Sequence, residues 1–352
     1  MPMHRSTVPA ASADGPQQPD FNAALVWGRL SGLSQHPMAR RALGVGVAVL
    51  LAYYAVSKSV EIGDRSLLVL LNGLTAAGLY FLMASGFTLV FGLARVTNLA
   101  HGGIYLLGGY GALSVQRSTG NWFLAALLGA LFAGGVSVVL YLVLRLLRGD
   151  GLRETMLTLG ATIVIADQVL ANWGGIPTDL DPPSFLTGSI DLPGSTLLYP
   201  KFRLAVVVLA FLAGLLLWVL LYKTRLGMLI RAGVDDPEMV SVLGIRVPLV
   251  LASVFALAGA LAGIAGAAGG TYLSLAQGED NRILLASLIV VIAGGLGSLR
   301  GAGAASVIVG LVEAFAQTHH PVLSVLITFG MLTAILVLRP HGLMGGAADA
   351  SA

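Results

Sequence analysis

Apolar segments of nearly membrane-spanning length dominate this chain and restrict its fold more than any other feature. A helix needs about 20 mostly apolar residues to cross a bilayer. Only 11% of the 352 residues are charged, whereas soluble domains carry about 25%, so a soluble fold with so little polar surface is excluded. We therefore expect an all-α, polytopic integral membrane protein. Ten segments come near that length: 42–57, 67–92, 98–116, 122–144, 155–172, 204–222, 248–274, 283–298, 302–318 and 321–338.

These segments predict about 10 transmembrane helices. Segments 98–116, 283–298 and 302–318 are short or interrupted by glycine, so eight full spans with re-entrant pieces are the alternative. We expect a disordered cytoplasmic tail at 1–37, a transmembrane domain at 38–346 and a short C-terminal tail at 347–352. With the N-terminus placed in the cytoplasm, most of the 20 Lys and Arg residues fall on the inner side. That bias predicts both termini inside and an even number of crossings.

Two long polar loops lie on opposite faces of this topology. The outer one, Asn172–Lys201, carries several prolines, which disfavour long regular structure. It is either a plain connector or a docking rim for a partner outside the cytoplasm. The inner one, Lys223–Val247, is too polar for lipid and too long for a tight turn, so it is a candidate docking surface for a soluble partner. Basic clusters with interleaved aromatics are absent, which argues against nucleic acid, and cysteine is absent altogether.

A polar cluster interrupts the third apolar segment. Thr97, Asn98 and His101 stand beside Gly102 and Gly103. Backbone freed inside a membrane must be satisfied within protein or a water-filled cavity, so one interpretation is a broken or re-entrant helix near a translocation path. The other is a short cytoplasmic turn after Arg95, with Asn98 capping the next helix. The residues alone leave both open, and His101 has no second ligand at the spacing that a metal site needs.

Glycines crowd the stretch Gly294–Gly301 without making it a nucleotide site. A P-loop needs a lysine followed by serine or threonine between a strand and a helix, and this stretch has neither. We interpret it as a tight inner turn joining two packed helices.

Two acids, Asp167 and Glu313, fall inside predicted spans. Carboxylates within a membrane are costly and serve as proton relays, substrate contacts or buried structural hydrogen bonds. Gln317 lies four residues after Glu313, on the same helix face, and can satisfy it locally. We favour a structural role for both acids.

The inner loop contains a predicted helix of about two turns. Asp235 or Asp236 serves as its N-cap, Pro237 occupies the first helical position and Glu238 the first turn. Gly244 ends it. The apolar side carries Met239, Val242 and Leu243, and it either rests on lipid or fills a groove on a soluble protein.

In the motifs described above, the chain resembles the branched-chain amino acid ABC transporter permeases of the Liv type. The resemblance covers roughly residues 66–346 in the family's order, although the tail and first segment extend beyond the usual start of the shorter Liv-type permease, and Asp167 has no clear counterpart. The matching pieces are Asn72-Gly73, Gly86–Gly92, Asn98–Gly102, Arg231-Ala232 with Asp236, Met239, Leu243-Gly244-Ile245, Gly294–Ser298 with Gly301, Glu313-Ala314, Arg339-Pro340, Gly342-Leu343 and Gly345.

The resemblance implies a permease subunit of an importer in the bacterial inner membrane, with two permease subunits, two cytoplasmic ATPase subunits and a periplasmic substrate-binding protein. ATP would bind the ATPases, so this chain would be no enzyme and would carry no cofactor or metal. Branched-chain amino acids, urea, short amides and aromatic acids are all substrates in related permeases. The expected translocation-path residues are Asn72, Asn98 and His101, and the expected ATPase-coupling residues are Arg231, Asp235, Asp236, Glu238, Met239, Leu243 and Gly244.

Two other functional classes are the alternatives. An ion-coupled secondary transporter would place Asp167 and Glu313 in the path, but we find no clear internal repeat of the kind such transporters often show. A membrane enzyme would need a metal cluster or a nucleophile–base motif, and the sequence contains neither.

Overall fold

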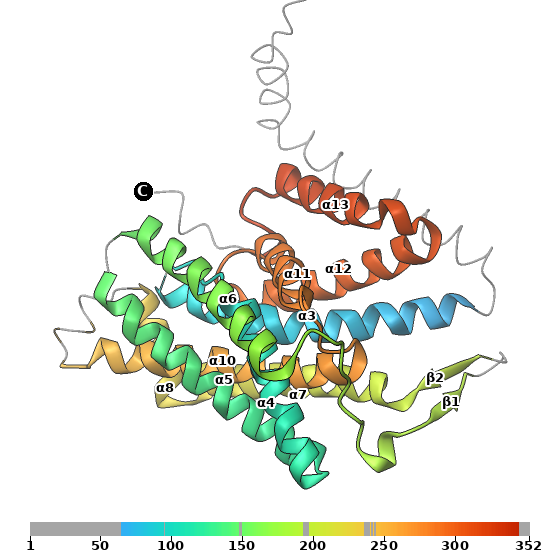
Figure 1. The fold of residues 1–352 in the computed structure, drawn as a ribbon. Helices are drawn as coiled ribbons and strands as arrows, with labels where there is room; N and C mark the ends of the chain where they lie inside the picture. Colours follow the sequence, from blue (N-terminus) through green and yellow to red (C-terminus); the bar gives the residue numbers. More distant parts are fainter. Residues whose placement is uncertain are drawn as a thin grey trace, which may run out of the picture.

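The computed structural model describes residues 65–94, 96–147, 150–192, 197–235, 240, 242 and 244–344. The predicted tails and the predicted first span, 42–57, lie outside these residues. The described elements, labelled as in Figure 1, are α3 (Arg65–Ala94), α4 (His101–Thr119), α5 (Trp122–Leu144), η1 (Arg145–Leu147), α6 (Gly151–Trp173), η2 (Ser184–Leu186), β1 (Ser189–Asp191), β2 (Leu198–Pro200), α7 (Lys201–Lys223), α8 (Arg225–Asp235), α10 (Val247–Tyr272), α11 (Glu279–Gly294), α12 (Leu299–His319), η3 (Pro321–Leu323) and α13 (Ser324–Leu338).

The all-α class is confirmed. Seven of the described helices are long and apolar enough to cross a membrane: α3, α5 with η1, α6, α7, α10, α12, and η3 with α13. Helices α4 and α11 match the predicted segments 98–116 and 283–298 but do not qualify, and α11 has only 16 residues. The predicted total of about ten spans is therefore not confirmed. The segment 302–318, which we placed among the three least regular, is a continuous helix.

The helices form a bundle with α8 at one end and the β1–β2 hairpin at the other (Figure 1). We call these the α8 end and the hairpin end. Helix α3 runs through the centre and is packed against α7, α10, α11 and α12. Most of its side chains are buried, which explains why its sequence is apolar all round rather than amphipathic.

Local sequence explains where the helices begin and end. Gly120, with φ of +67°, ends α4, and the next residue, Asn121, caps α5 by accepting hydrogen bonds from the N–H groups of Phe123 and Leu124. Ser298 likewise caps α12 by accepting from the N–H of Gly301 at 3.1 Å. Helix α11 ends at Gly294 and α12 begins at Leu299, so the predicted tight turn in the glycine-rich stretch is confirmed.

The outer loop, Asn172–Lys201, has little regular structure, as its prolines predicted. Its strands have three residues each and pair antiparallel. The buried Tyr199 of β2 anchors the hairpin to α3, because its hydroxyl lies 2.7 Å from Oγ1 of Thr75 and donates to the carbonyl of Leu71 at 2.9 Å. Strand β2 leads directly into α7, so this anchor also fixes the first turn of α7.

Candidate functional site

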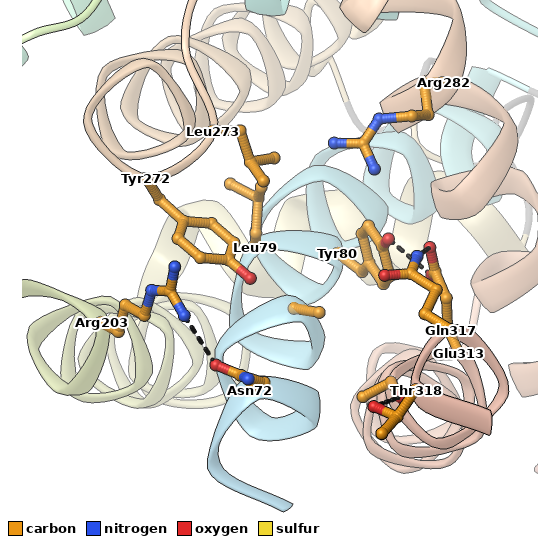
Figure 2. Close-up of a pocket in the computed structure, with 12 residues that line it drawn as sticks. Asn72, Leu79, Tyr80, Arg203, Tyr272, Leu273, Arg282, Glu313, Gln317 and Thr318 are labelled. Atoms are coloured by element: carbon orange, nitrogen blue, oxygen red, sulfur yellow. Dashed lines mark hydrogen bonds between the residues drawn. The ribbon is translucent and has the colours of Figure 1, made fainter. Parts of the chain in front are cut away.

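A polar pocket opens near the hairpin end of the bundle, between α3, α7, α10, α11 and α12 (Figure 2). Its volume is about 340 Å³. Tyrosine and charged side chains from five helices converge there, which is unusual between apolar helices. Its lining residues are Asn72, Ala76, Leu79, Tyr80, Arg203, Tyr272, Leu273, Arg282, Glu313, Ala314, Gln317 and Thr318.

Arg203 is held on one side of this pocket. Its Nη1 donates to Oδ1 of Asn72 at 2.8 Å, and its guanidinium lies 5.1 Å from the ring centre of Tyr272 and 5.9 Å from that of Tyr199. Cation–π contacts and the amide orient the cation without neutralising it. Among the described residues, Arg203 has no carboxylate partner. It can therefore receive an anionic group.

Glu313 lies across the pocket and is its single acidic lining residue. Its Oε2 accepts a hydrogen bond from the Tyr80 hydroxyl at 2.6 Å, and its Oε1 accepts from Nε2 of Gln317 at 2.8 Å. The contact with Gln317 is the one that the four-residue spacing predicted. Both donors are neutral, so neither brings a compensating positive charge to the carboxylate, which has lone pairs left for a cation.

Arg282 enters the pocket from the first turn of α11. It forms an ion pair with Glu279, with Nη2 of Arg282 2.8 Å from Oε2 of Glu279. The pocket thus offers one guanidinium that is already paired, one that is unpaired among the described residues, and one carboxylate held by neutral donors. This combination suits a ligand that carries both signs of charge.

The chain between α3 and α4 is not helical, and it lies inside the bundle. Thr162 Oγ1 donates to the carbonyl of Leu99 at 3.0 Å, and the N–H of Leu99 donates to Thr158 Oγ1 at 3.2 Å. Thr162 is 11 residues beyond the start of α6, which is about 16 Å along the helix. The break is therefore deep between the helices, with its backbone satisfied by threonine hydroxyls. This matches the broken-helix interpretation and not that of a turn at the bundle's end.

Asn98 and His101 are fully enclosed at this break. Asn98 Oδ1 accepts from the N–H of Ala100 at 3.1 Å, just before α4, which begins at His101 and has no side-chain cap at its N-cap residue Ala100. His101 Nε2 lies 3.1 Å from the carbonyl oxygen of Met83 and therefore carries the hydrogen. Nδ2 of Asn98 and Nδ1 of His101 are buried without a partner. The first is a donor, and the second is an acceptor because the hydrogen of the ring is on Nε2.

The structure does not gather all the predicted residues at one point. Asn72 lines the polar pocket, whereas Asn98 and His101 lie at the break and do not line it. Glu313 lines the pocket too, but Asp167 lies on an exposed face of α6. Sequence reasoning missed Arg203, Arg282, Tyr80 and Tyr272. The two arginines lie in the first turns of α7 and α11, at the ends of apolar segments, where arginine is common and no local pattern marks a site.

A second cavity, of about 560 Å³, opens at the α8 end between α3, α7, α8 and the start of α12. Two arginines flank the Tyr222 ring there, with Arg231 at 4.9 Å and Arg300 at 5.6 Å from its centre. Helix α8 itself was not predicted. It has a polar and an apolar face, with Ile230 buried and Arg231 exposed.

The predicted coupling residues are described only in part. Arg231 and Asp235 belong to α8, and Gly244 has a φ of +78°, the conformation of a residue that ends a helix. Asp236, Glu238, Met239 and Leu243 lie outside the described residues. The start of the predicted helix after Asp235 therefore stays a prediction.

Comparison with known proteins assigns the family. A family model described as "Branched-chain amino acid transport system / permease component" matches residues 69–336. This chain belongs to that family, and it is a multi-pass permease subunit of a transport system.

The individual relatives are also branched-chain amino acid transport permeases. The chain is 29% identical over 295 residues to the high-affinity branched-chain amino acid transport system permease protein BraD of Pseudomonas aeruginosa, covering 78% of this chain and 94% of BraD. It is 25% identical over 292 residues to the permease protein LivH of Escherichia coli, with the same coverages. It is 26% identical over 300 residues to the probable LivH of Methanocaldococcus jannaschii, covering 81% of this chain and 94% of that protein.

Proposed function

We propose that this chain is a permease subunit of an ATP-driven importer for branched-chain or other amino acids. The family match over residues 69–336 carries the proposal. A second permease subunit, two cytoplasmic ATPase subunits and a periplasmic substrate-binding protein complete the transporter. The chain lies in the bacterial inner membrane with the α8 end and both termini in the cytoplasm, as the distribution of basic residues supports.

The polar pocket at the hairpin end receives the substrate from the binding protein. Amino acids are zwitterions at neutral pH, and the pocket offers Arg203 to a carboxylate and Glu313 to an ammonium group. Charged groups inside a membrane domain are costly unless they meet partners. Opposite charges in one pocket therefore favour a zwitterion over a single-charge ion, which would leave one protein charge unmatched.

Alternating access moves the substrate from this pocket to the α8 end. The break at Asn98 and His101 lies between the two, and its unpartnered nitrogens offer polar contacts along the way. ATP-dependent closure of the ATPases drives the change. The second permease subunit covers α6, because Asp167 on the exposed face of that helix cannot rest in lipid without cost.

The segment from Arg231 to Gly244 passes the ATPase motion to the membrane domain. Helix α8 joins it to α7, and α8 also contacts α3 and α10. A displacement of α8 thus reaches the central helix directly. The predicted two-turn helix, with Met239 on its apolar side, supplies the part that fits a groove on the ATPase.

Replacing Asp236 and Met239 together tests this assignment. We expect the double variant D236A/M239A to lose the ATPase during co-purification, because the helix loses an N-cap candidate and an apolar anchor. An N-cap is worth about 1 kcal/mol, and burying a methionine side chain about 1.5–3 kcal/mol, so together we expect affinity to fall at least tenfold. Replacing the exposed Met228 of α8 is the matched control and should leave assembly intact. Unchanged co-purification and uptake in D236A/M239A would refute the coupling role.

A further inference from the structure

The second cavity, at the α8 end, is lined by two arginines whose charge no acidic side chain balances. Arg231 of α8 and Arg300 of α12 both line it, and both lie against the ring of Tyr222. The described residues that line this cavity include no acid, and neither arginine forms an ion pair with any described carboxylate. The ring orients the two cations without neutralising them. Two unneutralised cations in one cavity favour an anionic ligand.

Most of the donors of these arginines are available. Nε of Arg231 donates to the carbonyl oxygen of Gly227 at 3.4 Å, which is the one hydrogen bond that either guanidinium makes to a described residue. The Nη nitrogens of Arg231 and the whole guanidinium of Arg300 are therefore left for a ligand. A guanidinium presents parallel N–H groups that match the oxygens of a phosphate, so phosphate is the anion that this pair suits best.

A buried hydroxyl in the same cavity is an independent sign of a ligand. Thr88 of α3 lines the cavity and is only 2% exposed, and its Oγ1 has no hydrogen-bond partner in the described part of the chain. Threonine within a helix can bond a carbonyl of the preceding turn, but Thr88 does not. Buried polar atoms are nearly always paired, so this hydroxyl calls for a polar group that the described residues do not supply.

The rest of the cavity wall is apolar, and the cavity lies at the depth of the membrane surface. Leu89, Leu221 and Leu296 are among its lining residues. Tyr222 lies on α7 between Trp218, which is 40% exposed, and Lys223, whose Nζ is 5.7 Å from the centre of the Trp218 ring. Exposed tryptophan and lysine at the end of a spanning helix mark the membrane–water interface. A ligand at this depth meets both charged and apolar walls.

We infer that this cavity binds the phosphate of an anionic membrane lipid of the phosphatidylglycerol kind. Arg231 and Arg300 hold the phosphate, Thr88 donates to one of its oxygens, and the apolar walls receive the upper part of the acyl chains. Basic pockets between membrane helices bind anionic lipid headgroups in this way. A free phosphate ion would satisfy the arginines but leave the apolar walls unfilled. The inference depends on the membrane setting and not on the transported solute.

Lipid titration of the purified full chain in detergent, read by native mass spectrometry, tests the inference. The probes are phosphatidylglycerol, phosphatidylcholine with the same acyl chains, and inorganic phosphate. Phosphatidylcholine carries the same phosphate but adds a cation, which the arginines repel. The variants are R231Q/R300Q and R300Q alone, because Arg231 also belongs to the predicted coupling residues. The control is K223Q/R225Q, which removes two exposed cations at the same end that do not line the cavity.

We expect the wild-type chain to bind its first phosphatidylglycerol at least tenfold more tightly than phosphatidylcholine, because hydrogen bonds between charged groups are lost with the wrong headgroup. R231Q/R300Q should lose this preference, and R300Q and T88V should each weaken it. K223Q/R225Q should keep it. Both arginines are exposed, so their replacement should leave the chain folded, which elution as a single peak verifies.

Three results would overturn the inference. The first is an unchanged preference in R231Q/R300Q. The second is an equal loss in K223Q/R225Q, which would show that the surface charge of the α8 end attracts the lipid without a defined site. The third is displacement of phosphatidylglycerol by inorganic phosphate, which would make the cavity a site for a free anion.

Discussion

Replacing Gly266 with alanine is expected to destabilise the membrane domain more than any other single-methyl change considered. Gly266 of α10 faces α4, and a Cβ there would overlap the carbonyl oxygen of Tyr105 and lie 2.7 Å from the nitrogen of Gly109. Both are backbone atoms, so no side-chain rotation relieves the clash, and α4 must move away from α10. Overpacking of this kind costs about 1–3 kcal/mol and sometimes more. The measurement is the temperature at which the purified protein loses its folded peak on size-exclusion chromatography.

Gly135→Ala in α5 is the matched control. Gly135 also lies within a spanning helix, but an added Cβ would meet nothing within 4 Å. Alanine favours helix over glycine by about 1 kcal/mol, so G135A should be neutral or slightly stabilising. Equal stability of G266A and G135A would contradict the close α4–α10 packing.

Replacing Glu313 with glutamine is expected to reduce amino acid uptake at least tenfold without loss of folding. Glutamine keeps the volume and can still contact Tyr80 and Gln317, but the pocket loses its carboxylate and retains Arg203 and Arg282. The substrate's ammonium group then loses a charged hydrogen-bond partner, worth about 1.5–3 kcal/mol. Uptake rates of leucine into proteoliposomes at several concentrations measure the effect.

Gln317→Ala separates charge from general disturbance of the pocket. It removes a neutral donor to Glu313 and leaves the carboxylate of Glu313 in place, so we expect a smaller loss of uptake than in E313Q. Discrimination between leucine and its deaminated analogue 4-methylpentanoate should also weaken in E313Q. Wild-type uptake and discrimination in E313Q would leave Glu313 a structural role only, as the sequence alone favoured.

Sequence reasoning located most helices because a bilayer imposes a length and a composition on each span. Segment 122–144 illustrates this, since α5 covers Trp122–Leu144. The same rule does not confirm segment 98–116 as a full span, and its helix, α4, starts deep in the bundle at His101. Hydropathy records how apolar a segment is, and it cannot record the depth at which a helix begins. The threonines that satisfy the break, Thr158 and Thr162, are 59 and 63 residues along the chain from their partner Leu99.

The pocket was predictable only in part for a similar reason. Glu313 stood out because a carboxylate within an apolar segment is costly, and its contact with Gln317 followed from helix spacing. Arg203 and Arg282 stand at the ends of apolar segments, where arginine is common and carries no signal. Their convergence with Tyr80 depends on how α7, α11 and α3 pack, and a single sequence does not encode that arrangement in any local pattern.

The central claim is that this permease subunit imports amino acids at the expense of ATP hydrolysed by a partner. The most direct measurement is leucine uptake by proteoliposomes that contain this chain, the second permease subunit and the ATPases. The binding protein and leucine are added on the side of the membrane that the hairpin end faces. We predict uptake that requires ATP, stops with a non-hydrolysable analogue and is insensitive to proton or sodium gradients. Uptake driven by an ion gradient in vesicles without ATPase would contradict the account.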